Sequence, residues 1–307
     1  MSTPTDAPPQ ILALFGPTGV GKTAIAVALA RRLRERGEDP VAVSADALQI
    51  YAGLEILTGA ASPQERAELE HRLLSFVPLD ATFSVGQYAG LAHTEIDTLL
   101  ACRRRPIVVG GTGLYLRAAL AALDLRPAPT AGARERWTQR LQELGPTALH
   151  AELRRRAPWA AEQIDPRNSR RVVRALEALE AGETEPPTGP SQLWSEELRH
   201  PTLLAGLVME REALYAQIDA RVERIVAAGA GEEVRRADAA GVSETARKAL
   251  GFQELLDGDV ETMKQRTRNY ARRQLAWMRK LAGVQLIDVT GRPADDVAAE
   301  ILDSAAG

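Results

Sequence analysis

A short segment near the N-terminus has the residue types and the spacing to hold a polyphosphate. It reads Gly16-Pro17-Thr18-Gly19-Val20-Gly21-Lys22-Thr23, which fits the P-loop pattern G-x-x-x-x-G-K-[ST]. The glycines let the backbone curl so that successive N–H groups face one anion, and a following helix adds the positive end of its dipole. The Lys22 ammonium suits an outer phosphate, and the Thr23 hydroxyl suits Mg²⁺. We therefore expect residues 16–23 to bind a polyphosphate, with Mg²⁺ held through Thr23.

The acid expected closest to this loop is Asp46. In P-loop NTPases an acid usually ends a later apolar strand, but the apolar run at 107–109 is followed by glycines and no carboxylate. Asp46 comes directly after a different apolar run, which ends at Ser44. It is a candidate general base beside the phosphates; a helix N-cap and an outer ligand of Mg²⁺ are the alternatives.

A second glycine-rich turn reads Gly110-Gly111-Thr112-Gly113. Its glycines would let a ligand approach the backbone closely, and the Thr112 hydroxyl could donate to an oxygen that leaves with the electrons of a broken bond. A tight strand-to-helix turn without a ligand is the plainer interpretation. The turn alone therefore predicts only a location, at the same edge of the sheet as the P-loop.

The elements that position these motifs alternate between short apolar runs and helical stretches. Residues 23–36 are rich in alanine and leucine and are closed by Gly37, which predicts a helix. Strands alternating with helices form parallel sheets, whose ligands bind beyond the carboxyl ends of the strands. The predicted fold class is α/β, a P-loop nucleotide-binding-type parallel sheet flanked by helices, with an all-helical insertion domain. The predicted strands are 11–15, 41–44, 106–109, 203–209 and 284–289.

Two proline-rich breaks interrupt this alternation, at 126–132 and 185–190. The stretch between them has helical patterning and no strand signal, and the chain after Met209 is again helical until the run near residue 284. We therefore predict a core of residues 1–125 and 200–307, with basic C-terminal helices, and a helical insertion domain at 126–199.

Charge is distributed unevenly along a chain whose net charge is −3. Residues 263–281 hold seven cations and no acid, and residues 152–174 hold seven arginines against three acids. Such segments suit RNA phosphates, although solvated helix faces explain them as well. No apolar run approaches the roughly 18 residues of a membrane span. The single cysteine excludes an intrachain disulfide and fits a reducing, cytoplasmic setting.

Six blocks follow one another along nearly the whole chain: GPTGVGKT, SADALQIY, VVGGTGLYLRAAL, DPRNSRRVVRALE, ARKALGFQEL and RNYARRQLAWMRK. Together they resemble the tRNA dimethylallyltransferase family, the bacterial isopentenyl-tRNA transferases. The resemblance implies transfer of a dimethylallyl group from dimethylallyl diphosphate to N6 of adenosine-37, in tRNAs that read codons beginning with U. It also implies that the protein binds the anticodon stem-loop and requires no membrane, and we expect a monomer.

The resemblance gives catalytic roles to Lys22, Asp46 and Thr112. If the P-loop holds a diphosphate leaving group, no hydrolytic water has to be positioned and the missing NTPase acid is dispensable. Asp46 would remove the N6 proton as the new bond forms, and Thr112 would hydrogen-bond the bridging oxygen. The adenine would have to leave its stack to reach them.

The resemblance also implies RNA contacts by the basic segments and by residues beside the base. On the C-terminal helix, Met263, Tyr270, Trp277 and Leu281 form an apolar stripe for docking. Tyr51 and Phe252 could form a wall of the prenyl pocket or belong to the core, and we expect the core. The expected tRNA-binding residues are Asp46, Ala47, Leu48, Gln49, Thr112, Arg134, Arg170, Arg171, Arg174, Lys248, Arg268 and Arg272.

Three positions depart from the family pattern. Ala47 stands where the family has serine, residues 57–63 lack the family's lysine, and a paired-histidine stretch is reduced to His71. These departures affect the expected RNA contacts and leave the P-loop and Asp46 unchanged.

Two other functions remain possible at this point. A P-loop kinase of small molecules would also use an aspartate at a strand end, but the helical insertion and the basic C-terminal helix disfavour it. A prenyltransferase acting on free adenine nucleotides would not need that basic helix. A non-enzymatic RNA-binding protein would leave the P-loop without a purpose.

Overall fold

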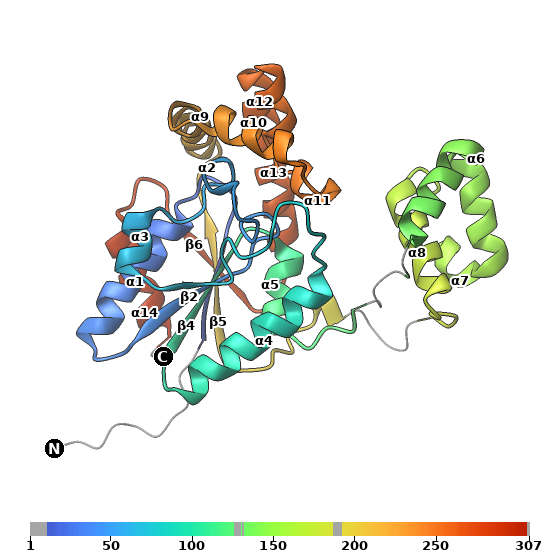
Figure 1. Cartoon of the computed structure of the whole chain (residues 1–307). Helices are drawn as coiled ribbons and strands as arrows, with labels where there is room; N and C mark the ends of the chain where they lie inside the picture. The colour runs from blue at the N-terminus through green and yellow to red at the C-terminus, as the bar shows by residue number, and fades with distance from the viewer. Residues whose placement is uncertain (1–10, 126–129, 131, 187–191, 306–307) are drawn as a thin grey trace. The chain divides into compact units, whose positions relative to one another are not determined.

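The computed structural model describes residues 11–125, 130, 132–186 and 192–305. Figure 1 shows the course of the chain. It divides into two compact units: a core unit of residues 1–123 and 193–307, and an insertion unit of residues 124–192. Each unit is described by itself below.

The core unit is built on a six-stranded sheet in the order β3-β2-β4-β1-β5-β6, and every pairing in it is parallel. All five predicted strands are present, which confirms the α/β class. The sequence analysis missed β3, because a strand of two half-exposed residues has no apolar run to reveal it. The strands are β1 Ile11–Phe15, β2 Pro40–Ser44, β3 His71–Arg72, β4 Arg105–Gly110, β5 Thr202–Val208 and β6 Val284–Asp288.

The register brings three strand ends into line. Phe15 of β1 lies opposite Gly110 of β4, and Ser44 of β2 lies opposite Val109. The P-loop, the segment that carries Asp46 and the glycine-rich turn 110–113 therefore all begin at one edge of the sheet. This is the edge at which ligands bind in sheets of this kind.

Helices cover both faces of the sheet, which is why β1 and β2 are buried at every position and are apolar except for Ser44 at the end of β2. On one face, α1 (Lys22–Glu35) packs against α14 (Ala294–Ser304). On the other, α4 (Val85–Ala101) packs against α5 (Gly113–Leu120) (Figure 1). The predicted helix at 23–36 corresponds to α1.

Short helices and a C-terminal helical layer gather beyond the carboxyl ends of the strands (Figure 1). The predicted helical character of the chain between Met209 and residue 284 is confirmed. The helices of that part of the chain are α9 Arg211–Ala227, α10 Ala230–Ala240, α11 Glu244–Arg247, α12 Phe252–Asp257 and α13 Val260–Met278. The short helix α2 (Glu55–Thr58) lies with them, and α3 (Pro63–Glu68) lies beside α1.

The described residues of the insertion unit are helical, as the sequence predicts. Its helices are α6 (Ala133–Arg156), α7 (Pro158–Glu162) and α8 (Ser169–Glu180), and a 3₁₀ turn, Gln192–Trp194, follows. Gly145 interrupts α6 with non-helical backbone angles just before Pro146. The helices share a small apolar core that includes Trp137, Leu149, Leu153, Val172 and Leu176.

The insertion unit ends earlier than the expected boundary at residue 199. Residues 193–199 belong to the core unit, where the buried Arg117 donates from Nη2 to Ser195 Oγ and to the Glu197 carbonyl, both at 3.4 Å. Arg199 and His200 each reach Asp97 over 2.7 Å. The proline-rich break marks a change in composition, whereas the boundary is set by these distant partners.

The two ends of the insertion unit lie next to each other. The backbone N–H of Asp124 donates to Oε1 of Gln192 over 2.6 Å. No helix in the described part of the chain is both long enough and apolar enough to cross a membrane.

Candidate active site

The segment that carries Asp46 lies directly beside the glycine-rich turn. The Ala45 amide donates to the Val109 carbonyl over 2.8 Å, and the Ala47 amide lies 3.4 Å from Thr112 Oγ1. The two segments continue the pairing of β2 with β4 past the ends of those strands. This continuation brings Asp46 and Thr112 together, as the sequence analysis expects.

The P-loop holds the ammonium group of Lys22 close to its own backbone. Lys22 Nζ donates to the carbonyl oxygens of Gly16 and Pro17, each at 3.0 Å. Burial lowers the pKa of Lys22 to about 8; the charge of Asp46 opposes this shift and Arg221 adds to it. The Lys22 charge is therefore poorly solvated, and an anion in the loop would stabilise it.

Asp46 caps a turn and not a helix. Its Oδ1 accepts the backbone N–H of Leu48 at 3.0 Å, and residues 47–50 form a turn before α2 begins at Glu55. The helix N-cap alternative is therefore wrong. This short-range hydrogen bond fixes the orientation of the carboxylate, and the side chain lines the same cavity as Lys22.

That cavity has a volume of about 960 Å³, a size typical of small-molecule sites. It lies at the predicted edge of the sheet, and α2, α9 and α13 complete its wall. Gly16, Pro17 and Val20 are buried behind the loop surface, and Thr112 follows the lining residue Gly111. The predicted site residues that line the cavity are Thr18, Gly19, Gly21, Lys22, Thr23, Asp46, Leu48 and Gln49.

Tyrosines surround Asp46 and Thr112. The Tyr270 hydroxyl lies 3.4 Å from Thr112 Oγ1. Burial first, and the charge of Asp46 second, raise the pKa of Tyr270 to about 12. Burial, with smaller effects from Tyr51 and Asp46, raises the pKa of Tyr115 to about 12 as well. These phenols stay neutral near pH 7, so they serve as donors and walls and not as bases.

Arg221 of α9 is a site residue that sequence reasoning missed. It lines the cavity, and its Nη2 donates to the Thr58 carbonyl over 2.8 Å. Burial lowers the pKa of its guanidinium, while the charge of Asp46 raises it. The sequence carries no signal for it, because α9 also contains Arg211 and Arg224 and nothing in the sequence distinguishes Arg221 from them. The fold places both Arg221 and Arg224 on the wall of the cavity.

Gln274 of α13 was also missed. Its Oε1 accepts the backbone N–H of Thr18 at 2.9 Å, and its Nε2 donates to the Gly111 carbonyl over 2.7 Å. Together with Met263, Thr267 and Tyr270 it forms the face of α13 that lines the cavity. The i, i+4, i+7, i+11 spacing of these four residues is the signal that could have found it.

The apolar stripe predicted on this helix divides between two environments. Met263 and Leu281 are buried, Tyr270 lines the cavity, and Trp277 packs on Trp194 with 4.5 Å between ring centroids.

The residues after Asp46 make local contacts at the rim of the cavity. Gln49 Nε2 donates to the carbonyl oxygens of Thr58 and Gly59, at 3.3 and 3.1 Å. Ala47 contributes its backbone N–H, as described above, and Leu48 lines the cavity. The prediction that Tyr51 and Phe252 are core residues is confirmed, since neither is exposed.

The predicted RNA-binding cations of the core unit differ in what they contact. Arg268 is half-buried, with its Nε 3.5 Å from Asp219. Arg272 is exposed and donates to the side chain of Asn269 on its own helix. Lys248 is exposed beside Glu244, with which it forms an ion pair. Arg272 and Lys248 are thus both exposed, although Lys248 is paired with an acid, whereas Arg268 is half-buried against an acid.

In the insertion unit, one buried acid holds two of the predicted arginines. Glu177 is fully buried; Arg134 reaches its Oε1 at 2.9 Å and Arg174 reaches its Oε2 at 3.2 Å. Arg170 and Arg171 of the same unit are exposed. The four arginines therefore belong to one small unit, and two of them are fixed in place by a shared carboxylate.

A Mg²⁺ ion at this site would draw few ligands from the protein. Thr23 and Asp46 line the same cavity. Among the residues that the structure describes, no group of three or more His, Cys, Asp or Glu side chains could hold a metal ion. Mg²⁺ usually takes one or two protein oxygens together with substrate phosphates and water. The hydroxyl of Thr23 and the carboxylate nearby therefore fit Mg²⁺ that binds together with a diphosphate.

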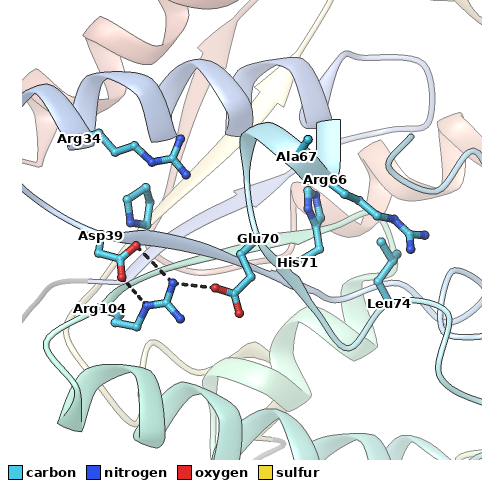
Figure 2. Close-up of a pocket in the computed structure, with 9 residues that line it drawn as sticks. Arg34, Asp39, Arg66, Ala67, Glu70, His71, Leu74 and Arg104 are labelled. Carbon is cyan, nitrogen blue, oxygen red and sulfur yellow. Dashed lines mark hydrogen bonds and ion pairs between the residues drawn. The ribbon is translucent and has the colours of Figure 1, made fainter. Parts of the chain in front are cut away.

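A second cavity of about 450 Å³ lies near the start of β2 and beside β3. Figure 2 shows Arg104 between Asp39 and Glu70, which it contacts at 2.6 and 2.7 Å. These charges satisfy one another at the surface, and we assign no function to this cavity.

Known proteins resemble this chain over most of its length. The family described as IPP transferase matches residues 49–281, and the family described as isopentenyl transferase matches residues 9–83. A tRNA dimethylallyltransferase of Thermobifida fusca is 40% identical over 88% of this chain and 87% of its own. One from Kineococcus radiotolerans is 41% identical over 88% of each chain.

A solved structure agrees with these sequence matches. The crystal structure of the tRNA isopentenylpyrophosphate transferase of Bacillus halodurans covers 97% of this chain and 96% of its own, with a TM-score of 0.69 and 32% identity. The resemblance stated from the six sequence blocks is thereby confirmed, and the chain belongs to the IPP transferase family, a family of tRNA dimethylallyltransferases.

Proposed function

We propose that this protein transfers a dimethylallyl group from dimethylallyl diphosphate to N6 of adenosine-37, in tRNAs that read codons beginning with U. The observation that carries the proposal is that the P-loop and Asp46 line one cavity, next to a strand that ends in glycines where an NTPase has an acid. A site of this kind can hold a diphosphate and deprotonate an acceptor without positioning a hydrolytic water.

The transfer reaction gives Asp46 and Thr112 one role each. The N6 nitrogen attacks C1 of the allyl group, the C1–O bond breaks, and its electron pair leaves on the bridging oxygen of diphosphate. Asp46 accepts the N6 proton, which the amine loses as the N–C bond forms. Thr112, held between the Ala47 amide and the Tyr270 hydroxyl, donates to the bridging oxygen as negative charge develops there.

The negative charge of the departing diphosphate would lie next to two side-chain cations that the fold has already buried. Lys22 and Arg221 both line the cavity, and burial lowers the pKa of each. An anion bound between them would stabilise both positive charges and so offset the cost of their desolvation. Thr23 would hold Mg²⁺, which when bound supplies further positive charge to the diphosphate oxygens.

The acceptor is an RNA base that has to leave its stack to enter the cavity. The exposed cations on α13 and in the insertion unit are candidates for binding the phosphates of the anticodon stem-loop. The proposal takes the active species to be a monomer in the cytoplasm.

A transfer assay with two labels separates the proposal from its alternatives. The purified protein is incubated with dimethylallyl diphosphate labelled in the allyl group, or with ATP labelled at the γ-phosphate, and with an anticodon stem-loop or AMP as acceptor. We expect label from the allyl donor on the stem-loop alone. Label from ATP would indicate a kinase, and prenylation of AMP as efficient as that of the stem-loop would indicate a nucleotide prenyltransferase.

A further inference from the structure

One side chain hydrogen-bonds both glycine-rich loops of the site. Gln274 Oε1 accepts a hydrogen bond from the Thr18 backbone N–H in the P-loop at 2.9 Å, and Gln274 Nε2 donates one to the Gly111 carbonyl at 2.7 Å. It is 5% exposed. An amide group suits this position because it offers an acceptor and a donor side by side. The P-loop and the turn of Thr112 are thus joined across two separate strand ends.

The sequence of the second loop is adapted to this contact. A Cβ atom placed on Gly111 would lie 2.5 Å from Gln274 Nε2, 3.3 Å from Lys22 Nζ and 3.4 Å from the Gly16 carbonyl. A side chain at 111 would therefore force the Gln274 amide to move from its place between the two loops. Gly111 thus leaves the space that the Gln274 amide occupies.

The same helix positions the residue next to the leaving-group donor. Tyr270 precedes Gln274 by one helical turn, and its hydroxyl lies 3.4 Å from Thr112 Oγ1. A shift of α13 would therefore move the Gly111 carbonyl and the Thr112 hydroxyl together. The P-loop would move with them, because it is attached through the Thr18 amide.

We propose that Gln274 is a positioning residue, which sets the spacing between the diphosphate in the P-loop and the Thr112 hydroxyl that meets its bridging oxygen. This inference rests on the proposed function. Its carbonyl oxygen and one N–H of its amide are held by backbone groups of the two loops, so we assign it a role in positioning the loops and not in the chemistry. Its effect is on where the C1–O bond lies relative to Thr112 and Asp46.

Three variants test the proposal. Gln274→Leu keeps most of the buried volume and removes both hydrogen bonds. Gln274→Glu keeps the acceptor for the Thr18 amide but sets a carboxylate oxygen against the Gly111 carbonyl. Gln265→Leu makes the first change at an exposed position of the same helix and serves as the matched control. Each is assayed for kcat and KM, for binding of Mg²⁺-diphosphate by calorimetry, for thermal unfolding, and for hydrogen exchange of the two loops.

We expect both Gln274 variants to lower kcat by about 10- to 100-fold, as misplacement of reacting groups does. Diphosphate affinity should change by less than about threefold, because Lys22 and the other loop amides remain. Peptides covering 16–21 and 110–113 should both exchange faster in these variants and not in Gln265→Leu. A wild-type kcat in a folded Gln274→Leu protein, or a lower melting temperature with kcat preserved, would overturn the proposal.

The exchange measurement does not depend on prenyl transfer. If the wild-type protein fails to prenylate the stem-loop, the proposed function falls, and the joining of the two loops is judged on exchange alone. Faster amide hydrogen exchange in both loops of Gln274→Leu would still support the conclusion that Gln274 holds the two loops together, whereas unchanged exchange would reject it.

Discussion

The guanidinium of Arg221 lies over the backbone of Thr58 and Gly59, and its Nη2 donates to the Thr58 carbonyl over 2.8 Å. A Cβ atom on Gly59 would overlap the guanidinium, and the residue has a φ of +57°. The turn after α2 therefore has to be a glycine for Arg221 to reach the cavity.

Gly59→Ala should displace Arg221 and weaken donor binding. We expect the KM for dimethylallyl diphosphate to rise by about tenfold, as for the loss of one charge-assisted hydrogen bond. Gly37→Ala is the matched control, because Gly37 has a φ of +80° with nothing within 4 Å of its added Cβ. Equal KM values in the two variants, measured by steady-state kinetics, would show that Arg221 does not bind the donor.

Asp46→Asn should block the chemical step and spare donor binding. Loss of a general base typically costs about 10²- to 10⁴-fold, and the asparagine can still accept the Leu48 amide that orients the side chain. Single-turnover transfer to the stem-loop measures the rate, and calorimetry with diphosphate measures binding. Asp303→Asn, an exposed change on α14, should match the wild type. An Asp46→Asn protein with the normal single-turnover rate would remove Asp46 as the base.

Donor affinity should fall as the pH rises through about 8. Burial lowers the pKa of Lys22 to about 8, and only the protonated ammonium attracts the diphosphate. The affinity is therefore complete below this pH and is lost above it, by up to about tenfold for each pH unit. Calorimetry with an unreactive donor analogue measures this between pH 7 and 9, where its phosphates, with a pKa of about 6, are already ionised.

Lys22→Arg is the control for that titration, because arginine stays protonated throughout the range. Its affinity, whatever its absolute value, should not vary between pH 7 and 9. The same decline with pH in both proteins would assign the titration to a group other than Lys22.

Replacing Arg272 and Arg279 together with alanine should weaken tRNA binding at low salt. Both side chains are exposed on the C-terminal part of α13 and just after it. Each lost phosphate contact should reduce the slope of log affinity against log salt by about 1. Arg268→Ala is the comparison, because Arg268 faces Asp219; its effect on the slope should be smaller. An unchanged slope in the double variant would show that this face of α13 contacts solvent and not RNA.

The parts of the fold that the sequence predicts are those with a local signal. The strand at Ile11–Phe15 is apolar at every position because helices cover both of its faces, and the P-loop is contiguous in the chain. The strand at His71–Arg72 lacks such a signal, since it pairs through only two residues at the sheet margin.

The missing part of the site comes from helices far away in the chain. Arg221 and Gln274 meet the P-loop only because α9 and α13 cross the carboxyl edge of the sheet. Their partners are backbone carbonyls and an amide, which every residue has, so no complementary residue type in the loops announces the contact. The cation pattern of α13 likewise did not reveal that Arg268 faces Asp219.

The hydrogen bond between Asp124 and Gln192 holds the first and last residues of the insertion unit next to each other. A segment attached in this way can gain or lose residues without changing the separation of its attachment points, so the sheet bears no strain from its length. The length and sequence of the insertion unit, which we propose binds RNA, can therefore change while the diphosphate site in the core unit is kept.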